Sequence, residues 1–508
     1  MVCPVNKIDS NVATLAIAEE ECPKQLPAAP VWYFQEPNSY NDFGAEISTV
    51  ARSPIDPTRQ RLKGTVSDID ATGGFTADLT KTNMTRLMQG FLFADARQDF
   101  STQPIKGGGF ALTNVDDALI KYEAADGLGE LKAGDLLYAS GFTVPSNNGF
   151  KKVSDANNLG VIVWGALVAE VPPAAAKLDR VGHEFAEGDV ALTVAAGIVT
   201  LTAGAGTFNN YGFTAGQWVF LGGDATVNQL AANIGYARIL NVAEKTLTFD
   251  MTTFAPVANL GAGIALQMFW GTVIRNEPTP EMIKRRTYQL ERQLGRDAVG
   301  VQSEYITGAV PNELTVSIPT TDKITVDLTF VGLDAEQRTG TDGLKGGTRV
   351  AAKGEDAYNT STQVYRQRMY TYDPGTTNPT GLFGYISEAE ITLTNNVSAN
   401  KAVGVAGGFD TSAGTLEVGG TVTAYFTNIA AIQAIRQNRD VGFYTIVAGN
   451  NSGVIFDLPL VGLGGGQLNI ETDSPITIPI ENNAYKSKFG YTVLTEFFAY
   501  LPNVAQPK

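Results

Sequence analysis

The chain has 508 residues, 44% of them hydrophobic, and a formal net charge of −15 at pH 7. This length is enough for about two to four domains with sizeable cores. The negative charge argues against a protein that grips nucleic-acid phosphates, which requires a basic surface, although it is compatible with an acidic wall past which DNA slides without sticking.

The first 41 residues, 1–41, are predicted to form an N-terminal arm. Residues 19–21 are all glutamate and are followed by a proline-rich segment, which opposes a helix or a core strand. Residues 32–34 are Trp, Tyr and Phe. They are either anchors on this or a neighbouring subunit, or a local packing cluster.

Residues 42–97 are predicted to start a first half-domain. A strand is expected at 75–79, followed by a short helix whose start Thr82 or Asn83 would cap by accepting a backbone hydrogen bond. The expected apolar face of this helix consists of Leu87, Met88 and Phe91.

Residues 98–270 have a different composition, rich in Ala, Gly, Leu and Val, and read as an insertion. Segment 131–141 resembles segment 213–223, and the linker at 172–176 separates the two. We therefore predict two small β modules of a few strands each.

Residues 271–339 complete the first half-domain. A strand is expected at 287–294, and 314–332 reads as a hairpin. In its second strand Ile324, Val326, Leu328 and Phe330 alternate with Thr325, Asp327 and Thr329. Strict alternation predicts one face in a core and the other in water.

Residues 340–383 show little periodicity and are predicted to be a long loop, of functional or interfacial use. A second half-domain follows at 384–501, and 502–508 is a short tail. The elements expected in the second half-domain are strands at 390–394, 420–426, 454–460 and 468–471, and a helix at 428–437.

The sequence patterns of the two half-domains repeat one another. Gly73 and Gly74 precede a strand and a helix, and Gly419 and Gly420 do the same in the second half. Segment 462–480 carries the same pattern as the hairpin at 314–332: Leu314 aligns with Leu468, and, after a two-residue change in the turn, Ile324 aligns with Ile476. An internal duplication, with the insertion lying inside the first copy, follows from these matches.

Reactive groups are sparse. Cys3 and Cys22 are the only cysteines, which excludes a disulfide framework and suits assembly in a reducing cytoplasm. His183 is the single histidine and lies in an acidic stretch, so Ser-His-Asp and Cys-His catalysis and a zinc site are all disfavoured. The glycines at 462–466 precede a strand rather than the helix that a dinucleotide loop requires. We predict no catalytic, cofactor-binding or metal-binding residues, no cofactor, and no enzymatic activity.

The N-terminus lacks a basic segment followed by an apolar run, and no apolar run has the length of a transmembrane helix. We expect neither a signal peptide nor contact with a membrane. The abundance of glycine, threonine and valine favours a mainly β fold.

Several segments resemble the major tail tube protein of long-tailed bacteriophages. They are TYQLERQL, YITGAVPNELTVSIP and ITVDLTFVGLD in the first half, and GGTVTAYFTNIAAIQAI and FDLPLVGLGGGQLNIETDSPITIPIENNAY in the second. The resemblance covers 45–97, 271–334 and 384–500, roughly half of the chain. It implies two tandem tail-tube β-sandwich or barrel domains, 42–97 with 271–339 and 384–501, each with one short helix.

The resemblance also implies function. Such subunits form rings that stack into a tube, and the acidic lumen conducts DNA from capsid to host. The implied partners are further copies of the chain, the tape measure protein, the tail terminator and distal tail proteins, with only transient, non-specific passage of DNA. With two tube domains per chain, a trimeric ring is favoured over a hexameric one. The implied location is the virion tail, assembled in the host cytoplasm.

Within this interpretation we expect the insertion 98–270 to project outward, and its deletion to leave tubes able to form. Either 340–374 or the N-terminal arm would bridge adjacent rings. Two alternatives stay open from the sequence: a bacterial surface or adhesion protein with tandem β modules, and a carbohydrate-active β-protein in which Trp164 or Trp218 lines an acidic cleft.

Overall fold

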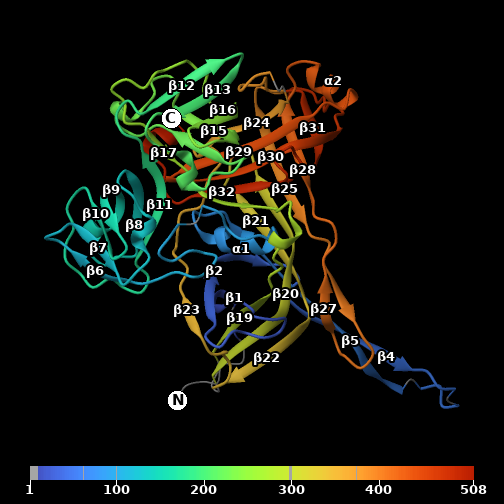
Figure 1. Ribbon diagram of the computed structural model, residues 1–508. Coiled ribbons are helices and arrows are strands. Elements are labelled where there is room, and N and C mark those ends of the chain that lie inside the picture. The colour runs from blue at the N-terminus through green and yellow to red at the C-terminus, as the bar shows by residue number, and fades with distance from the viewer. Residues whose placement is uncertain are drawn as a thin grey trace. The chain divides into compact units, whose positions relative to one another are not determined.

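The computed structural model describes residues 8, 10–55, 57–60, 62–98, 100–296, 300–372 and 375–507. The fold is mainly β, as the sequence predicts. The chain divides into two compact units (Figure 1). The first unit comprises Met1–Ala94, Glu281–Ala357 and Ala389–Thr421, and the second comprises Asp95–Pro280, Tyr358–Glu388 and Val422–Lys508.

The first unit is built around an antiparallel sheet in the order β5-β21-β20-β25. Leu328 of β21 lies opposite Phe75 of β5 on one side and Leu314 of β20 on the other. The hairpin predicted at 314–332 is therefore confirmed. The strands concerned are β5 (Leu62–Asp78), β20 (Val301–Ile318), β21 (Thr325–Gly332) and β25 (Ile386–Thr394).

Helix α1 (Asn83–Phe91) covers the apolar face of this sheet. The ring of Phe91 lies edge-on to Phe330 with centroids 5.5 Å apart, and Leu87 and Met88 are buried beside it, as predicted. The predicted cap is wrong, because no side chain of Thr82 or Asn83 accepts a hydrogen bond from the helix. Instead the Glu355 carboxylate accepts the Thr82 N–H at 2.8 Å, where a negative charge also complements the helix dipole.

The segment predicted to be an N-terminal arm is, from residue 10 onward, part of the first unit. Strand β1 (Thr14–Glu19) pairs with β19 (Tyr288–Arg296) and with β2 (Val31–Gln35). Trp32 is fully buried and packs edge-on against Tyr305. The three consecutive glutamates argue against a core strand. The Glu20 carboxylate is nevertheless buried, and it accepts the Gly308 N–H at 3.0 Å. Residues 1–7 lie outside the described part.

The remaining strands of the first unit extend this framework. They are β3 (Pro37–Tyr40), β4 (Gly44–Arg52), β22 (Asp334–Gly340), β23 (Thr348–Val350), β26 (Ser398–Lys401), β27 (Gly408–Ser412) and the first part of β28 (Glu417–Tyr425).

The interval 340–383 contains strands β23 and β24 (Val364–Thr371), where the sequence analysis expects one long loop. Strand β24 pairs with β29 (Val441–Gly449), yet most of its residues are only half-buried, so its sequence lacks strict alternation. The strand expected at 468–471 is also absent, since that stretch forms only an isolated bridge between Asn469 and Thr477.

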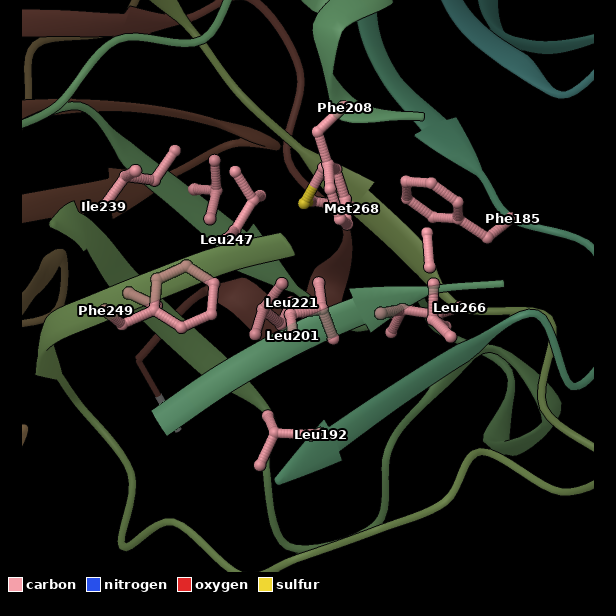
Figure 2. Close-up of a cluster of buried hydrophobic side chains, with 14 of the residues drawn as sticks. Phe185, Leu192, Leu201, Phe208, Leu221, Ile239, Leu247, Phe249, Leu266 and Met268 are labelled. Atoms are coloured by element: carbon pink, nitrogen blue, oxygen red, sulfur yellow. The ribbon is translucent and has the colours of Figure 1, made fainter. Parts of the chain in front are cut away.

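The inserted region lies in the second unit and forms a twelve-stranded sheet. One buried cluster belongs to residues 112–178 and another to residues 185–270 (Figure 2). Phe185, Leu201 and Phe249 are among the side chains that fill the second cluster. The strands are β6 (Leu112–Asp116), β7 (Lys121–Ala124), β8 (Asp135–Ser140), β9 (Gly149–Asn157), β10 (Gly160–Val163), β11 (Lys177–Glu184), β12 (Val190–Ala195), β13 (Ile198–Ala203), β14 (Trp218–Leu221), β15 (Gly235–Val242), β16 (Thr246–Thr252) and β17 (Gln267–Phe269).

The two ends of the inserted region meet. The Arg97 N–H donates to the Val273 carbonyl at 2.8 Å, and the Val273 N–H donates back at 2.9 Å. Val273 belongs to β18 (Thr272–Arg275), which pairs with β32 (Leu494–Phe498).

The rest of the second unit contains the second helix, α2 (Ala430–Arg436), whose first N–H is accepted by the Asn428 side chain at 2.8 Å. Ile432 and Ile435 pack beside a small core formed by Ala424, Ile478 and Ile480. The remaining strands are β30 (Ser452–Gly465) and β31 (Thr477–Ala484).

Candidate assembly and channel surfaces

One face of the sheet β5-β21-β20-β25 is polar across all four strands. In one cross-strand row Thr76, Asp327, Thr315 and Thr392 lie side by side, and the next row contains Asp78, Thr325, Ser317 and Glu390. These side chains alternate with the buried residues that face α1. The sheet therefore separates an apolar core from a surface of hydroxyl and carboxylate groups, which we call the acidic face.

The charges of the acidic face are mostly negative. Asp327 accepts a hydrogen bond from Asn41 at 3.0 Å, and Glu313 and Glu390 add further carboxylates. Lys323 forms an ion pair with Asp78 at 2.8 Å at the end of the hairpin. A surface of this kind presents acceptors and negative charge to a passing phosphate and offers it little to bind.

A second surface is the two-stranded ribbon formed by β4 and the first part of β5, which extends away from the rest of its unit (Figure 1). Every β4 residue from Glu46 to Arg52 is exposed. A two-stranded ribbon is at best marginally stable alone in water. This one is therefore expected to gain order from a covering surface.

The two faces of the ribbon differ in polarity. Ile47 lies opposite Ile69, and Thr49 lies opposite Val66, which places these side chains on one face. Ile47 and Val66 are 58% and 60% exposed. Glu46, Asp68 and Asp70 occupy the other face. An apolar surface on a projecting element is typical of a protein contact.

A hairpin from the second predicted tube domain, β26–β27, is fastened to this ribbon. The Lys401 ammonium forms ion pairs with both Asp68 and Asp70, and its hydrogen bond lowers the pKa of the Asp68 carboxyl. The turn between β26 and β27 exposes Val403, and β27 exposes Phe409. The hairpin β26–β27 is thus attached through the acidic residues of the ribbon and exposes apolar side chains of its own.

The inserted region is joined to the rest of the second unit by a shared core. The ring of Trp218 lies 5.0 Å from Tyr444, and that of Tyr236 lies 6.0 Å from Phe498. The same cluster contains Leu136 and Ile455. Removing residues 98–270 would therefore expose this core, which argues against the expectation that tubes can form without them.

Buried polar groups lie within this junction. Glu496 accepts the backbone N–H of Trp218 at 3.0 Å and that of Gly271 at 2.9 Å. Burial raises the pKa of the Glu496 carboxyl to about 8, although these hydrogen bonds oppose the shift. Asp457 accepts the Trp218 indole N–H at 3.0 Å and pairs with Arg238.

The reactive residues considered from the sequence are not assembled into a recognisable reaction centre. His183 lies 2.8 Å from the Asp135 carboxylate and packs against Phe185 and Tyr211. Cys22 is exposed and unpaired, and Cys3 lies outside the described residues. The described residues contain no cluster of metal-ligand side chains and no helix of membrane-spanning length and hydropathy.

Sequence reasoning missed the ribbon and the junction. The ribbon is partly visible as alternation at 44–50, where Ala45, Ile47 and Thr49 alternate with Glu46 and Ser48. The junction leaves no local pattern, because Arg238 and Glu496 are far apart along the chain.

A comparison with curated proteins found no match. The sequence pattern of the family described as phage tail tube protein matches residues 10–484. The match covers the first predicted tube domain, the inserted region and residues 384–484 of the second predicted tube domain, and the mainly β fold agrees with it. The chain belongs to the phage tail tube protein family and is a structural component of the virion tail.

Proposed function

We propose that this chain assembles with further copies of itself into rings, that the rings stack into a tube, and that the acidic face lines the lumen through which DNA passes. The observation that carries the proposal is the polar surface spread over β5, β21, β20 and β25 above a closed core. Its carboxylates repel phosphate, so DNA can move without being retained.

The two predicted tube domains, 42–97 with 271–339 and 384–501, support a trimeric ring. In the first copy the Leu79 N–H donates to the Ile324 carbonyl at 2.8 Å. In the second the Phe426 N–H donates to the Ile476 carbonyl at 3.0 Å, and Ile324 and Ile476 are the residues that align in sequence. Three chains with two domains each would give a ring of pseudo-sixfold symmetry.

The ribbon β4–β5, with β26–β27 attached, is the element we assign to contact with a neighbouring copy. Its exposed Ile47 and Val66 would be buried there. This assignment replaces the N-terminal arm, whose strands β1 and β2 are built into their own unit.

The tape measure protein would fill the lumen during assembly, and the tail terminator and distal tail proteins would close the ends. Assembly would take place in the host cytoplasm. In this role the chain performs no catalysis and needs no cofactor.

Electron microscopy of the purified, concentrated protein tests the proposal. Hollow rings or tubes are expected, and end-on class averages should contain three chains. Six chains per ring would refute two tube domains per chain. Monomers that stay uniform at every concentration, even with tail-tip complexes added as initiator, would refute self-assembly.

A further inference from the structure

A strongly exposed tryptophan marks the inserted region. Trp164 directly follows β10, and its backbone N–H donates to the Lys152 carbonyl of β9 at 2.8 Å. This bond keeps the residue in register with the sheet, while the side chain is 65% exposed. The indole is therefore held by rigid backbone and is open to solvent.

A network of polar side chains begins beside the indole. The Lys152 ammonium lies 5.9 Å from the ring centroid of Trp164 and forms an ion pair with Glu184. The other Glu184 oxygen accepts hydrogen bonds from Gln267 at 2.8 Å and from Asn228 at 3.4 Å. Strands β9, β11 and β17 and the turn at Asn228 thus contribute to one cluster.

The chemistry of this cluster restricts what it could bind. Lysine and glutamate neutralise one another, which disfavours a strongly charged ligand such as a polyphosphate. A purely apolar partner is also disfavoured, because it would remove water from the Lys152–Glu184 ion pair without replacing the lost hydrogen bonds. What fits is a neutral ligand with an apolar C–H face for the indole and hydroxyl groups for the neighbouring charged pair, as in a sugar ring.

We propose that Trp164, Lys152, Glu184, Gln267 and Asn228 form a glycan-binding platform on the inserted region. The indole supplies the stacking surface, and the Lys152 ammonium beside it can donate to a hydroxyl group, while Gln267 and Asn228 hold the Glu184 carboxylate that pairs with Lys152. The side chains rest on paired strands and are ordered before the ligand arrives, which lowers the entropic cost of binding. This platform is additional to the proposed tube function and does not depend on it.

Binding of the full-length chain to an array of neutral bacterial surface polysaccharides tests the proposal. At least one polysaccharide should bind, and Trp164→Ala should weaken that binding at least about tenfold, in line with the loss of an aromatic anchor. Trp164→Phe should retain part of it. Leu260→Ala, at a site 76% exposed outside the platform, is the control and should bind as the unmodified chain does.

Two outcomes would overturn the platform. One is that no polysaccharide binds the unmodified chain above background, and the other is equal binding by Trp164→Ala. If Trp164→Ala instead changes the oligomeric state measured by light scattering, the indole is covered by a second copy, and the glycan assignment is likewise wrong.

Discussion

Arg238 and Asp457 form an ion pair, 3.0 Å from Nη1 to Oδ2, in which both side chains are completely buried. Arg238 also holds Asp250 at 2.9 Å. The pair joins β15 of the inserted region to β30. Asp457 also accepts the Trp218 indole N–H, and Asp250 also pairs with Lys488 at 2.8 Å, so the Arg238 guanidinium is the cation that both buried carboxylates share.

Replacing Arg238 should strongly destabilise the folded protein. Arg238→Ala leaves buried charge uncompensated, and we expect a loss of about 3–5 kcal/mol in the free energy of unfolding, measured by urea denaturation. Lys323→Ala, which breaks the exposed pair with Asp78, should cost no more than about 1 kcal/mol. Equal losses for both variants would show that Arg238 is not shielded from water.

Stability should fall as pH rises toward 8. The Glu496 pKa is raised to about 8, well above its ordinary value, so the folded state holds this proton more tightly than the unfolded chain. Its contribution is complete below the unfolded pKa and is lost as pH rises through about 8.

Glu496→Gln removes this titration. The variant should show a flatter dependence of melting temperature on pH between about 5 and about 8, even if it is less stable throughout because the amide nitrogen cannot accept the second N–H. An unchanged pH slope in the variant would assign the effect to another group.

Substitutions on the exposed face of the ribbon should abolish tube assembly without unfolding the monomer. Ile47→Asp combined with Val66→Asp changes exposed positions, so monomer stability should shift by no more than about 0.5 kcal/mol while tube formation is lost. Val171→Asp, at an exposed position of the inserted region, is the control and should assemble normally. Normal tubes from the double variant, seen by electron microscopy, would remove the ribbon from the interface.

Reversing charges on the acidic face should create DNA binding that weakens as the salt concentration rises. Glu313→Lys combined with Glu390→Lys should leave tubes intact but retain double-stranded DNA in co-sedimentation at about 50 mM salt, and less at about 200 mM. Asp117→Lys, on the exposed surface of the inserted region, is the control that adds positive charge away from the acidic face. If both variants retain DNA equally, the acidic face has no special role.

Deletion of 98–270 should be damaging, contrary to the expectation from the sequence. The ends could be joined, because Arg97 and Val273 are hydrogen-bonded neighbours. However, the deletion would uncover Tyr444 and Phe498, remove Trp218 and Arg238 from Asp457, and remove the Trp218 N–H from Glu496. We expect aggregation on expression, and a soluble, tube-forming deletion variant would contradict this.

The sequence predicts elements well where burial follows a local period. Val326, Leu328 and Phe330 alternate with polar residues and lie where expected, and Leu87, Met88 and Phe91 face the core from α1. Such patterns depend on which side of one strand or helix faces the interior.

Features that depend on distant partners could not be predicted. Glu20 lies next to two other glutamates and suggests a solvated arm, yet Gly308 supplies the hydrogen bond that allows its burial. Glu355 caps α1 from a segment predicted to be a loop. The acidic face emerges only when the register places Thr76, Asp327 and Thr392 in one row.

The shared core also limits how relatives of this chain can diverge. Recombination that exchanges only the inserted region would bring a foreign surface onto Asp457, Glu496 and Tyr444, whose burial depends on Arg238 and Trp218. We therefore expect the inserted region to be inherited together with β30 and β32 as one block. New surface specificities would then arise by substitution around solvent-facing positions such as Trp164, rather than by replacement of the whole region.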